Sequence, residues 1–303
     1  MDTVAAVIVT YNRKALLEKA VQAVLRQTHP VDLLFIIDNA SNDGTTQYLQ
    51  DLGYLDNSRV RYIRLPENTG GAGGFHEGMK QAVEAGHNWL WLMDDDGIPD
   101  DTCLARLLNQ ATGYDVLGSA VINPNDPEKL SLKLRIIDTQ GYFVKRQYIQ
   151  TYSELRDQAS QGIYPGTANF FNGVLINKSI PEKIGCVKKE LFIWGDEYEY
   201  FLRIKQAGFS IGTVVNAIYR HPDSVFKFTR IKYYYYFRNL IYIHKNYSSV
   251  MYRPNLRWLF PIYTIVNCLR MTPSLSPNYM LKVIWAVFRA WQGQLIPYSS
   301  VQT

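Results

Sequence analysis

The sequence predicts an α/β fold, in which a mostly parallel sheet carries helices on both faces and is followed by a helical C-terminal region. Continuous apolar, β-branched runs alternate with stretches whose apolar residues recur at helical spacing, which is typical of parallel sheets. The 303 residues are 47% hydrophobic and 19% charged, as in a folded globule. Beyond Asp223 no carboxylate side chain occurs, so the aromatic, basic C-terminal part differs in composition from the rest.

Each predicted element has a local signal. Residues 4–10, VAAVIVT, form the kind of apolar run that parallel strands bury on both faces. Similar runs predict strands at residues 33–37, 60–64, 89–93, 115–122, 168–176 and 210–221. Helical spacing or capping residues predict helices at residues 13–27, after 41–45, at 75–86 and at 196–208. The remaining long segments are a predicted loop, 65–74, and a loop-rich stretch with a hairpin, 123–170.

Polar residues gather where the predicted strands end. Asn12, Asp38, the glycine-rich loop and the triplet Asp94 to Asp96 each follow a strand. In open α/β sheets the ligand site lies at the carboxyl ends of the strands. This convergence predicts a functional site at that edge of the sheet.

The glycine-rich stretch NTGGAGG, residues 68–74, matches neither common nucleotide-binding fingerprint. Counted from Gly71, the third glycine position of a Rossmann motif is filled by His76, and the chain has no P-loop Gly-Lys-Ser/Thr. One interpretation is a flexible turn. The other is a backbone that passes close to a nucleotide, because residues without side chains permit close approach.

The stretch WLWLMDDDGIPD, residues 89–100, sets three carboxylates directly after a buried strand. A solvated turn, with Asp100 or Asp101 capping the next helix, is one interpretation. Strand alternation, however, turns Asp94 and Asp96 to the same side. Carboxylate oxygens suit Mg²⁺ or Mn²⁺, which can bridge to a diphosphate. The second interpretation is therefore a metal site.

Taken together, these motifs resemble family 2 inverting glycosyltransferases of GT-A fold. The carriers are VIVTYNR, IIDNASNDGT and WLMDDDG. The galactofuranosyltransferase and rhamnosyltransferase branch is more similar still, through ENTGGAGGFHEGM, WGDEYEYFLRIKQAGF, AIYRH and YYYYFRNLIYI. The resemblance covers most of residues 4–245.

The resemblance implies a nucleotide-sugar site in which Asp38 accepts a hydrogen bond from the base. That site would comprise Thr10, Asn12, Arg13, Asp38, Asn68, Gly70, Gly71, Gly74, Asp94 and Asp95. The donor would be UDP-galactofuranose or, as second choice, dTDP-rhamnose. The acceptor would be a lipid-linked surface glycan, and no nucleic-acid partner is expected.

The resemblance also implies the catalytic groups. Asp94, Asp96 and His221 would hold Mn²⁺ or Mg²⁺ on the donor diphosphate, and Trp194 would form a wall for the acceptor sugar. Asp196 is the expected general base, at the start of a helix whose N-terminus favours the ionised carboxylate.

The motif WGDEYE departs from close galactofuranosyltransferases by Gly195 before Asp196 and by an added Glu197, expected at the acceptor side. Either carboxylate could therefore be the base that takes the acceptor proton. With one base and no protein nucleophile, sugar transfer would be a single displacement with inversion. Two alternatives are a sugar-phosphate nucleotidyltransferase and a non-enzymatic nucleic-acid-binding protein.

The C-terminal region is strongly basic. Residues 221–303 contain ten Lys or Arg and one acid. Two aromatic segments, 257–271 and 281–294, are too short and too charged to span a bilayer but suit helices on its surface. A helical cap or a contact between copies in a homo-oligomer is the alternative.

This composition divides the chain into a catalytic domain and a C-terminal appendage. The expected boundaries are residues 1–225, with a nucleotide-sugar half at about 1–122 and an acceptor half at about 123–225, and residues 226–303. The chain starts directly on a strand, and its three cysteines have no metal-type spacing, so we expect reduced thiols. The expected location is cytoplasmic, peripheral on the inner face of the membrane.

Overall fold

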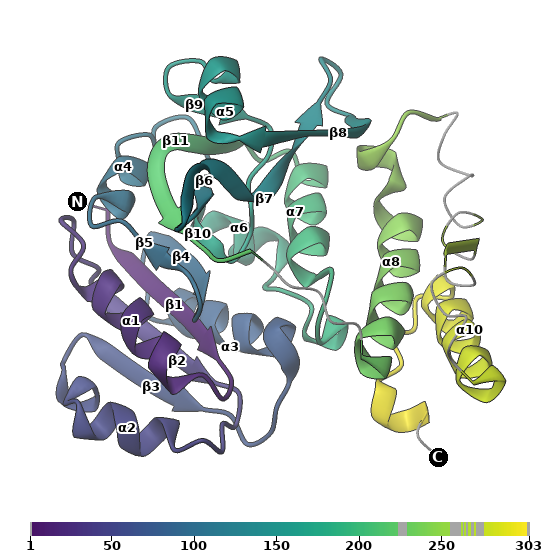
Figure 1. Cartoon of the computed structure of the whole chain (residues 1–303), viewed down its shortest axis with the longest axis horizontal. Helices are drawn as coiled ribbons and strands as arrows, with labels where there is room; N and C mark the ends of the chain where they lie inside the picture. The colour runs from purple at the N-terminus through teal and green to yellow at the C-terminus, as the bar shows by residue number, and fades with distance from the viewer. Residues whose placement is uncertain are drawn as a thin grey trace.

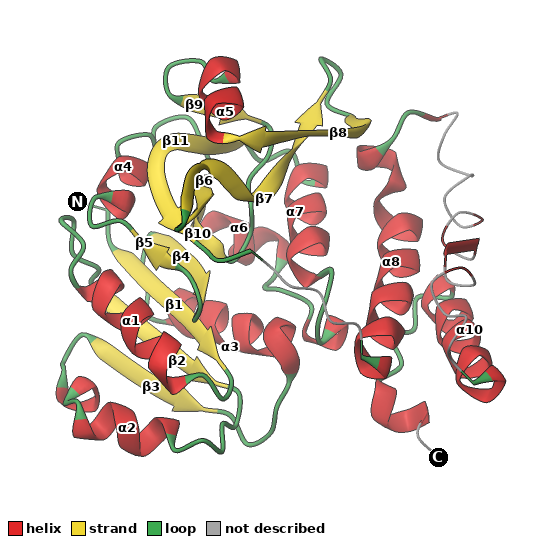
Figure 2. Ribbon diagram, in the orientation of Figure 1, coloured by secondary structure: helices red, strands yellow, loops and turns green. Residues whose placement is uncertain are grey.

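The computed structural model describes residues 2–223, 229–254 and 276–301, with single positions 262, 264, 266, 267 and 270. A twisted sheet forms the centre of the chain, and helices cover both of its faces (Figures 1 and 2). Two long helices, α8 (Arg230–Met251) and α10 (Pro277–Trp291), stand side by side at one end of the sheet (Figure 1). The predicted fold class is confirmed.

The N-terminal half of the sheet is entirely parallel. Its strands are β1 (Val4–Thr10), β2 (Leu33–Asp38), β3 (Val60–Arg64) and β4 (Trp89–Asp94), in the order β3-β2-β1-β4. All seven residues of β1 are buried, as its unbroken apolar sequence predicts. Within β1, Val7 packs in one core with Met79, and Ile8 packs in the other with Val21. Both faces of this strand are therefore covered.

The helices of this half separate onto the two faces. One core contains residues of α1 (Lys14–Leu25) and α4 (Cys103–Leu108), and the other contains residues of α3 (Gly70–Glu84). The short elements α2 (Thr45–Asp51) and η1 (Tyr54–Asp56) connect β2 to β3. Strand, helix and strand therefore alternate along the chain, as expected for a parallel sheet.

The other half of the sheet is mixed. Strand β10 (Asn172–Asn177) runs antiparallel between β4 and β6 (Val116–Asn123), and β11 (Ile211–Arg220) lies parallel to β6. The short strand β5 (Ile98–Pro99) completes this edge beside β11. Antiparallel β10 thus joins two parallel parts, and its direction could not be read from its apolar sequence.

The stretch predicted to be loop-rich holds more regular structure than expected. Strands β7 (Asp126–Ile137) and β8 (Phe143–Thr151) form a long hairpin, followed by α5 (Tyr152–Gln158) and β9 (Ile163–Pro165). Helix α5 begins with a capping box, in which Thr151 accepts from the Glu154 backbone N–H and the Glu154 carboxylate accepts from the Thr151 N–H. Only the hairpin was predicted.

The predicted loop 65–74 is wrong in its second half, because α3 begins at Gly70. A Cβ atom on Gly74 would lie 2.4 Å from Val9 Cγ1, and one on Gly78 would lie 2.3 Å from Val7 Cγ1. Both distances are too short for any side chain. The glycines therefore let α3 pack directly against β1, a long-range contact that local propensity does not reveal.

The C-terminal part packs onto the rest of the chain through α8. The elements between β10 and the C-terminus are α6 (Ser179–Ile184), η2 (Lys189–Leu191), α7 (Asp196–Gln206), β11, α8, α10 and η4 (Tyr298–Val301). Ile243 and Tyr247 of α8 belong to the same core as α3 and α7, whereas Tyr234 packs with α10. Most of segment 257–271 lies outside the described residues. The domain boundaries stay a prediction.

Candidate active site

A cavity of about 850 Å³ opens at the carboxyl ends of β1 and β4, where the sequence predicts the site. The predicted site residues that line it are Arg13, Gly71, Asp94, Asp96, Trp194, Asp196, Glu197 and His221. These residues come from five separate stretches of the chain. The cavity therefore brings together the predicted metal ligands, the predicted base and the predicted acceptor wall.

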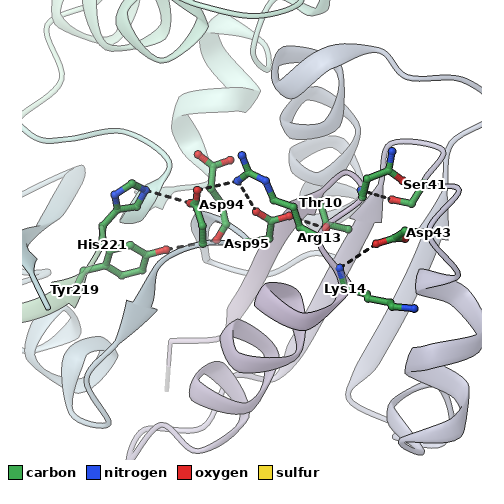
Figure 3. Close-up of polar contacts among 11 residues, drawn as sticks. Thr10, Arg13, Lys14, Ser41, Asp43, Asp94, Asp95, Tyr219 and His221 are labelled. Carbon is green, nitrogen blue, oxygen red and sulfur yellow. Dashed lines mark hydrogen bonds and ion pairs between the residues drawn. The ribbon is translucent and has the colours of Figure 1, made fainter. Parts of the chain in front are cut away.

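The side chains of the aspartate triplet lie on two sides of the chain, as strand alternation predicts. Asp94 and Asp96 line the cavity, whereas Asp95 is buried and accepts from Thr10 Oγ1 at 2.6 Å. Arg13 Nη1 bridges the triplet, at 3.1 Å from Asp95 Oδ1 and 2.7 Å from Asp96 Oδ2 (Figure 3). Thr10 and Asp95 thus position the Arg13 guanidinium at the cavity wall.

The carboxylates of the triplet differ in the direction in which their pKa values are shifted. Burial raises the pKa of Asp94 well above its usual value, and the negative charges of Asp96 and Asp95 add to this. Burial alone would also raise the pKa of Asp96, but the His221 hydrogen bond and the Arg13 charge outweigh it, so that pKa lies below its usual value. The crowded carboxylates thus disfavour ionisation of Asp94, and a bound cation would relieve that repulsion.

His221 has the geometry of a metal ligand. Its Nδ1 lies 2.6 Å from the carbonyl oxygen of Pro222, which can only accept, so Nδ1 carries the proton. Nε2 then faces Asp96 Oδ1 at 3.1 Å; when Nε2 is protonated this contact is the hydrogen bond that lowers the Asp96 pKa, and a cation could take the place of that proton. Metal-binding histidines commonly donate their other N–H to a carbonyl in this way.

Asp94, Asp96 and His221 form an incomplete donor set, so a divalent cation here would need further ligands from a substrate. Among the described residues, no three His, Cys, Asp or Glu side chains are grouped closely enough to hold a metal by themselves. Mg²⁺ is usually bound by one or two carboxylates plus substrate phosphates rather than by a complete protein cage. Asp94, Asp96 and His221 would thus hold the cation from one side.

Several predicted nucleotide-binding residues do not line the cavity. Asp38 is fully buried, and its carboxylate accepts from Ser41 N at 2.8 Å and from the Tyr62 hydroxyl. Asn12 Oδ1 accepts from Asn42 N at 2.7 Å and so fixes the neighbouring loop. Their contact with a base stays a prediction.

The glycine-rich turn contacts protein at most of its positions. Asn68 Oδ1 accepts from Gly70 N at 2.8 Å, and a Cβ on Gly70 would lie 2.0 Å from Phe192 O. A Cβ on Gly74 would strike β1, as described above. Only at Gly71 is there room, with Asp196 Oδ2 at 3.7 Å from such an atom. Close approach thus serves the packing of α3, and a role of these residues toward nucleotide stays a prediction.

Asp196 is the first residue of α7 and points into the cavity wall, whereas Glu197 is exposed. Burial raises the pKa of Asp196 well above its usual value, and the neighbouring Glu197 carboxyl raises it further. The effect of the helix N-terminus, expected to favour the ionised form, is therefore outweighed by burial. A raised pKa makes the ionised Asp196 carboxylate a stronger proton acceptor, which suits a general base.

Backbone strain concentrates around this site. Among the described non-glycine residues, six have positive φ, namely Asn12, Ala40, Gln161, Phe171, Phe192 and Trp194. All but Gln161 follow β1 or β2 or belong to segments next to the cavity. Such conformations persist only where the surroundings enforce them, and they cluster at functional sites.

The surroundings that enforce the strained 192–195 segment are on α8, in a motif to which the sequence assigned no role. Asn239 Nδ2 donates to the carbonyl oxygens of Leu191, Ile193 and Trp194 at 2.9, 3.0 and 2.6 Å. Arg238, fully buried, donates to Glu190 O at 2.6 Å. The pair holds the segment that carries Trp194 and leads into Asp196.

Asn172 is another cavity residue that the sequence did not single out. It was predicted only as part of a strand. Its Oδ1 is buried and has no hydrogen-bond partner among the described residues, while Nδ2 donates to Phe170 O at 2.9 Å. Since an unpaired buried acceptor is unfavourable, Asn172 Oδ1 is available to a ligand hydroxyl.

Comparison with known proteins gives a consistent result. The family model described as glycosyl transferase family 2 matches residues 5–173. Galactofuranosyltransferase GlfT1 of Mycolicibacterium smegmatis is 35% identical over 236 residues, which cover 76% of this chain and 74% of the relative. The GlfT1 of Mycobacterium tuberculosis is 37% identical over 225 residues, 73% of this chain and 70% of the relative.

Solved structures share the fold. A mannosyltransferase of Pyrobaculum calidifontis, in complex with GDP-Man and Mn²⁺, superposes with a TM-score of 0.59 at 14% identity. The match covers 98% of this chain and 77% of the other. At this identity the likeness concerns the architecture, and it includes the C-terminal helices.

Proposed function

The chain belongs to glycosyl transferase family 2, and from this premise we propose that it transfers galactofuranose from UDP-galactofuranose, with inversion, to a lipid-linked surface glycan. That it is a glycosyltransferase follows from the family itself, which decides against the nucleotidyltransferase and nucleic-acid-binding alternatives. The observation that carries the finer proposal is the single cavity shared by Asp94, Asp96, His221 and Asp196.

The residues of the cavity divide the work. Asp94, Asp96 and His221 would hold Mn²⁺ or Mg²⁺, which as a Lewis acid stabilises the charge on the departing diphosphate. Arg13, with its side chain half exposed, offers a further positive charge to the donor. Asp196 would take the proton of the acceptor hydroxyl as it attacks the anomeric carbon. No protein nucleophile takes part, so the sugar inverts.

The donor sugar is argued from the relatives. Both galactofuranosyltransferases align over roughly three quarters of this chain, and rhamnose is the next candidate because the sequence motifs are shared by that branch. Trp194 and Glu197 line the cavity on the side of Asp196 and would contact the acceptor sugar.

A donor screen tests this proposal. We expect purified protein with Mn²⁺ and acceptor-containing membranes to release nucleotide fastest from UDP-galactofuranose, more slowly from dTDP-rhamnose, and not from UDP-galactopyranose. Excess EDTA should stop the release, because the diphosphate then loses its cation. Full activity in EDTA would contradict the metal, and exclusive use of dTDP-rhamnose would contradict the donor assignment.

The C-terminal helix α10 supports a peripheral contact with membrane. Its buried face, with Val283 and Val287, packs in one core with α8. Large apolar side chains on its outer face are exposed by 42–65%, namely Leu281, Ile284, Trp285, Phe288 and Trp291. No described helix combines the length and apolarity that crossing a bilayer requires.

The positive charge of the C-terminal region also favours contact with a membrane surface. An apolar helix face in a region with ten basic residues and one acid suits anionic lipid, as on the inner leaflet. We therefore place the enzyme on the inner membrane face, where it would meet a lipid-linked acceptor. Contact between copies of the chain is the alternative partner for this face.

Changes on α10 should weaken vesicle binding. We expect Trp285→Ser with Phe288→Ser to lower partitioning onto phosphatidylglycerol vesicles by roughly tenfold or more, because two apolar side chains no longer leave water. The control is Leu16→Ser with Leu52→Ser, whose side chains are 41% and 43% exposed on another part of the surface.

Vesicle sedimentation measures the effect. Point changes are preferred to truncation because Arg238 Nη1 donates to Ile296 O at 2.7 Å, so removal of the C-terminus would disturb α8. Equal sedimentation of the α10 variant and the wild type would refute the membrane contact. Loss of a dimer in the variant, without any change in sedimentation, would assign the face to self-association.

A further inference from the structure

Arg135 occupies an unusual position on the wall of the cavity. It lies on β7, and its guanidinium carbon is 4.9 Å from the ring centre of Phe143, 5.5 Å from that of Tyr148 and 5.1 Å from that of Tyr198. Tyr148 comes from β8 and Tyr198 from α7. Three aromatic rings from two elements, β8 and α7, thus hold one charged group in place. Arg135, Tyr148 and Tyr198 all line the cavity.

The Arg135 guanidinium makes no hydrogen bond or ion pair with any described residue. Other half-buried or buried arginines do: Arg203 donates to Ile184 O at 2.6 Å, and Arg238 donates to Glu190 O at 2.6 Å. A guanidinium carries five N–H donors in a planar fork that matches carboxylate or phosphate. Arg135 is therefore oriented by its rings but leaves its donors for a ligand.

Two lysines extend this positive patch along the cavity. Lys133, two residues earlier on β7, lines the cavity and donates only to the neutral Gln150 amide oxygen, at 2.6 Å. Lys232 lines it from α8, and no described carboxylate forms an ion pair with it. The three cations come from β7 and α8, whereas the predicted metal ligands and Arg13 come from the carboxyl ends of β1, β4 and β11. The cavity thus has a second group of cationic side chains, which come from other elements than the first.

We propose that Arg135, with Lys133 and Lys232, forms a subsite for the phosphate or diphosphate group of the acceptor. The proposal rests on the proposed function, in which the acceptor is lipid-linked. The donor diphosphate is assigned to the aspartate triplet, so a second anion must belong to the other substrate. Arg135 packs on Tyr198, two residues after Asp196. An anion held there would therefore set the acceptor hydroxyl beside the proposed base, and an acceptor with a neutral aglycone would bind poorly.

Binding of geranyl diphosphate to the full chain, by calorimetry in EDTA, tests the subsite without transfer. We expect Arg135→Gln to weaken this binding by roughly 10- to 100-fold, the usual range for hydrogen bonds to a charged group. Arg135→Lys keeps the charge and should recover part of the affinity. The matched control is Arg156→Gln, whose guanidinium lies 5.1 Å from the Tyr152 ring but outside the cavity. It should bind like the wild type.

Further binding measurements distinguish a lipid-linked diphosphate from free diphosphate, and distinguish failure of this subsite from failure of the proposed function. Geraniol should not bind, and inorganic pyrophosphate should bind more weakly than geranyl diphosphate, with the same dependence on Arg135. Lys133→Gln, at an exposed position that no ring holds, gives a second test should Arg135→Gln unfold. Mn²⁺·UDP affinity should stay unchanged in both variants, so failure here leaves the donor site untouched.

Four results would overturn the subsite. The first is that the wild-type protein binds no geranyl diphosphate, and the second is that both Arg135→Gln and Lys133→Gln keep full affinity for it. The third is that UDP displaces geranyl diphosphate, and the fourth is that geraniol binds as tightly as geranyl diphosphate. Equal affinity for inorganic pyrophosphate would assign the patch to free diphosphate and overturn its role toward the acceptor.

Discussion

Asp196→Asn is expected to bind donor and metal like the wild type while sugar transfer falls by roughly 10²- to 10⁴-fold, the usual contribution of a general base. The asparagine amide has nearly the same shape, but it cannot accept the proton of the acceptor hydroxyl. Single-turnover transfer and Mn²⁺·UDP calorimetry measure the two effects separately.

The pH dependence and the stability of Asp196→Asn provide a second signature. Burial, and then Glu197, raise the pKa of Asp196 well above its usual value. A base works only when ionised, so wild-type kcat/KM should fall as the pH drops through this pKa, and the variant should lose that step. When the pKa of a carboxyl is higher in the folded than in the unfolded state, the fold is stabilised at low pH. That stabilisation is lost as the pH rises through the folded-state pKa. At neutral pH the uncharged variant should therefore have an unfolding midpoint at a denaturant concentration at least as high as that of the wild type.

Glu197→Gln is the matched control, because Glu197 lines the same cavity but is exposed. It should lower transfer far less than Asp196→Asn does, because the glutamine amide can still contact the acceptor sugar. Near wild-type transfer by Asp196→Asn, together with an inactive Glu197→Gln, would assign the base to Glu197. The alignment of this motif with that of related galactofuranosyltransferases would then be wrong by one residue at Gly195.

Asp96→Ala is expected to abolish metal-dependent donor binding, and Asp94→Ala to weaken it severely. In Asp96→Ala we expect Mn²⁺·UDP affinity to fall by more than roughly 100-fold, since the loss of an outer-shell partner alone costs 10- to 100-fold. Asp96 Oδ1 contacts His221 Nε2 at 3.1 Å and Oδ2 accepts from Arg13 at 2.7 Å, so both neighbours also lose their partner.

Calorimetry with and without Mn²⁺ separates this effect from damage to the nucleotide pocket. Asp101→Ala serves as a control, because Asp101 follows the same turn but its side chain is 61% exposed and 3.7 Å from Arg26. Unchanged Mn²⁺·UDP affinity in Asp96→Ala would remove Asp96 from the metal site.

Much of the nucleotide half could be predicted from the sequence. Unbroken apolar runs identified β1, β2 and β4, because both alternating sets of side chains are apolar in a strand that is buried on both faces. The same patterns placed Asp94 and Asp96 on one side and Asp196 at a helix start, since these are local, periodic properties. The edge of the sheet that holds the site followed from the parallel topology alone.

Only the tertiary structure decided the rest, because it depends on contacts between distant segments. Helix α3 begins at Gly70, since β1 approaches so closely that Gly74 and Gly78 tolerate no side chain. The raised pKa of Asp196 comes first from burial, which overrides the local effect of a helix N-terminus. Arg135 became a candidate ligand only when three rings from two elements, β8 and α7, closed around it. Local pattern thus determined which residues form strands and helices, whereas packing across the chain determined which charged groups face a common cavity without a partner of their own.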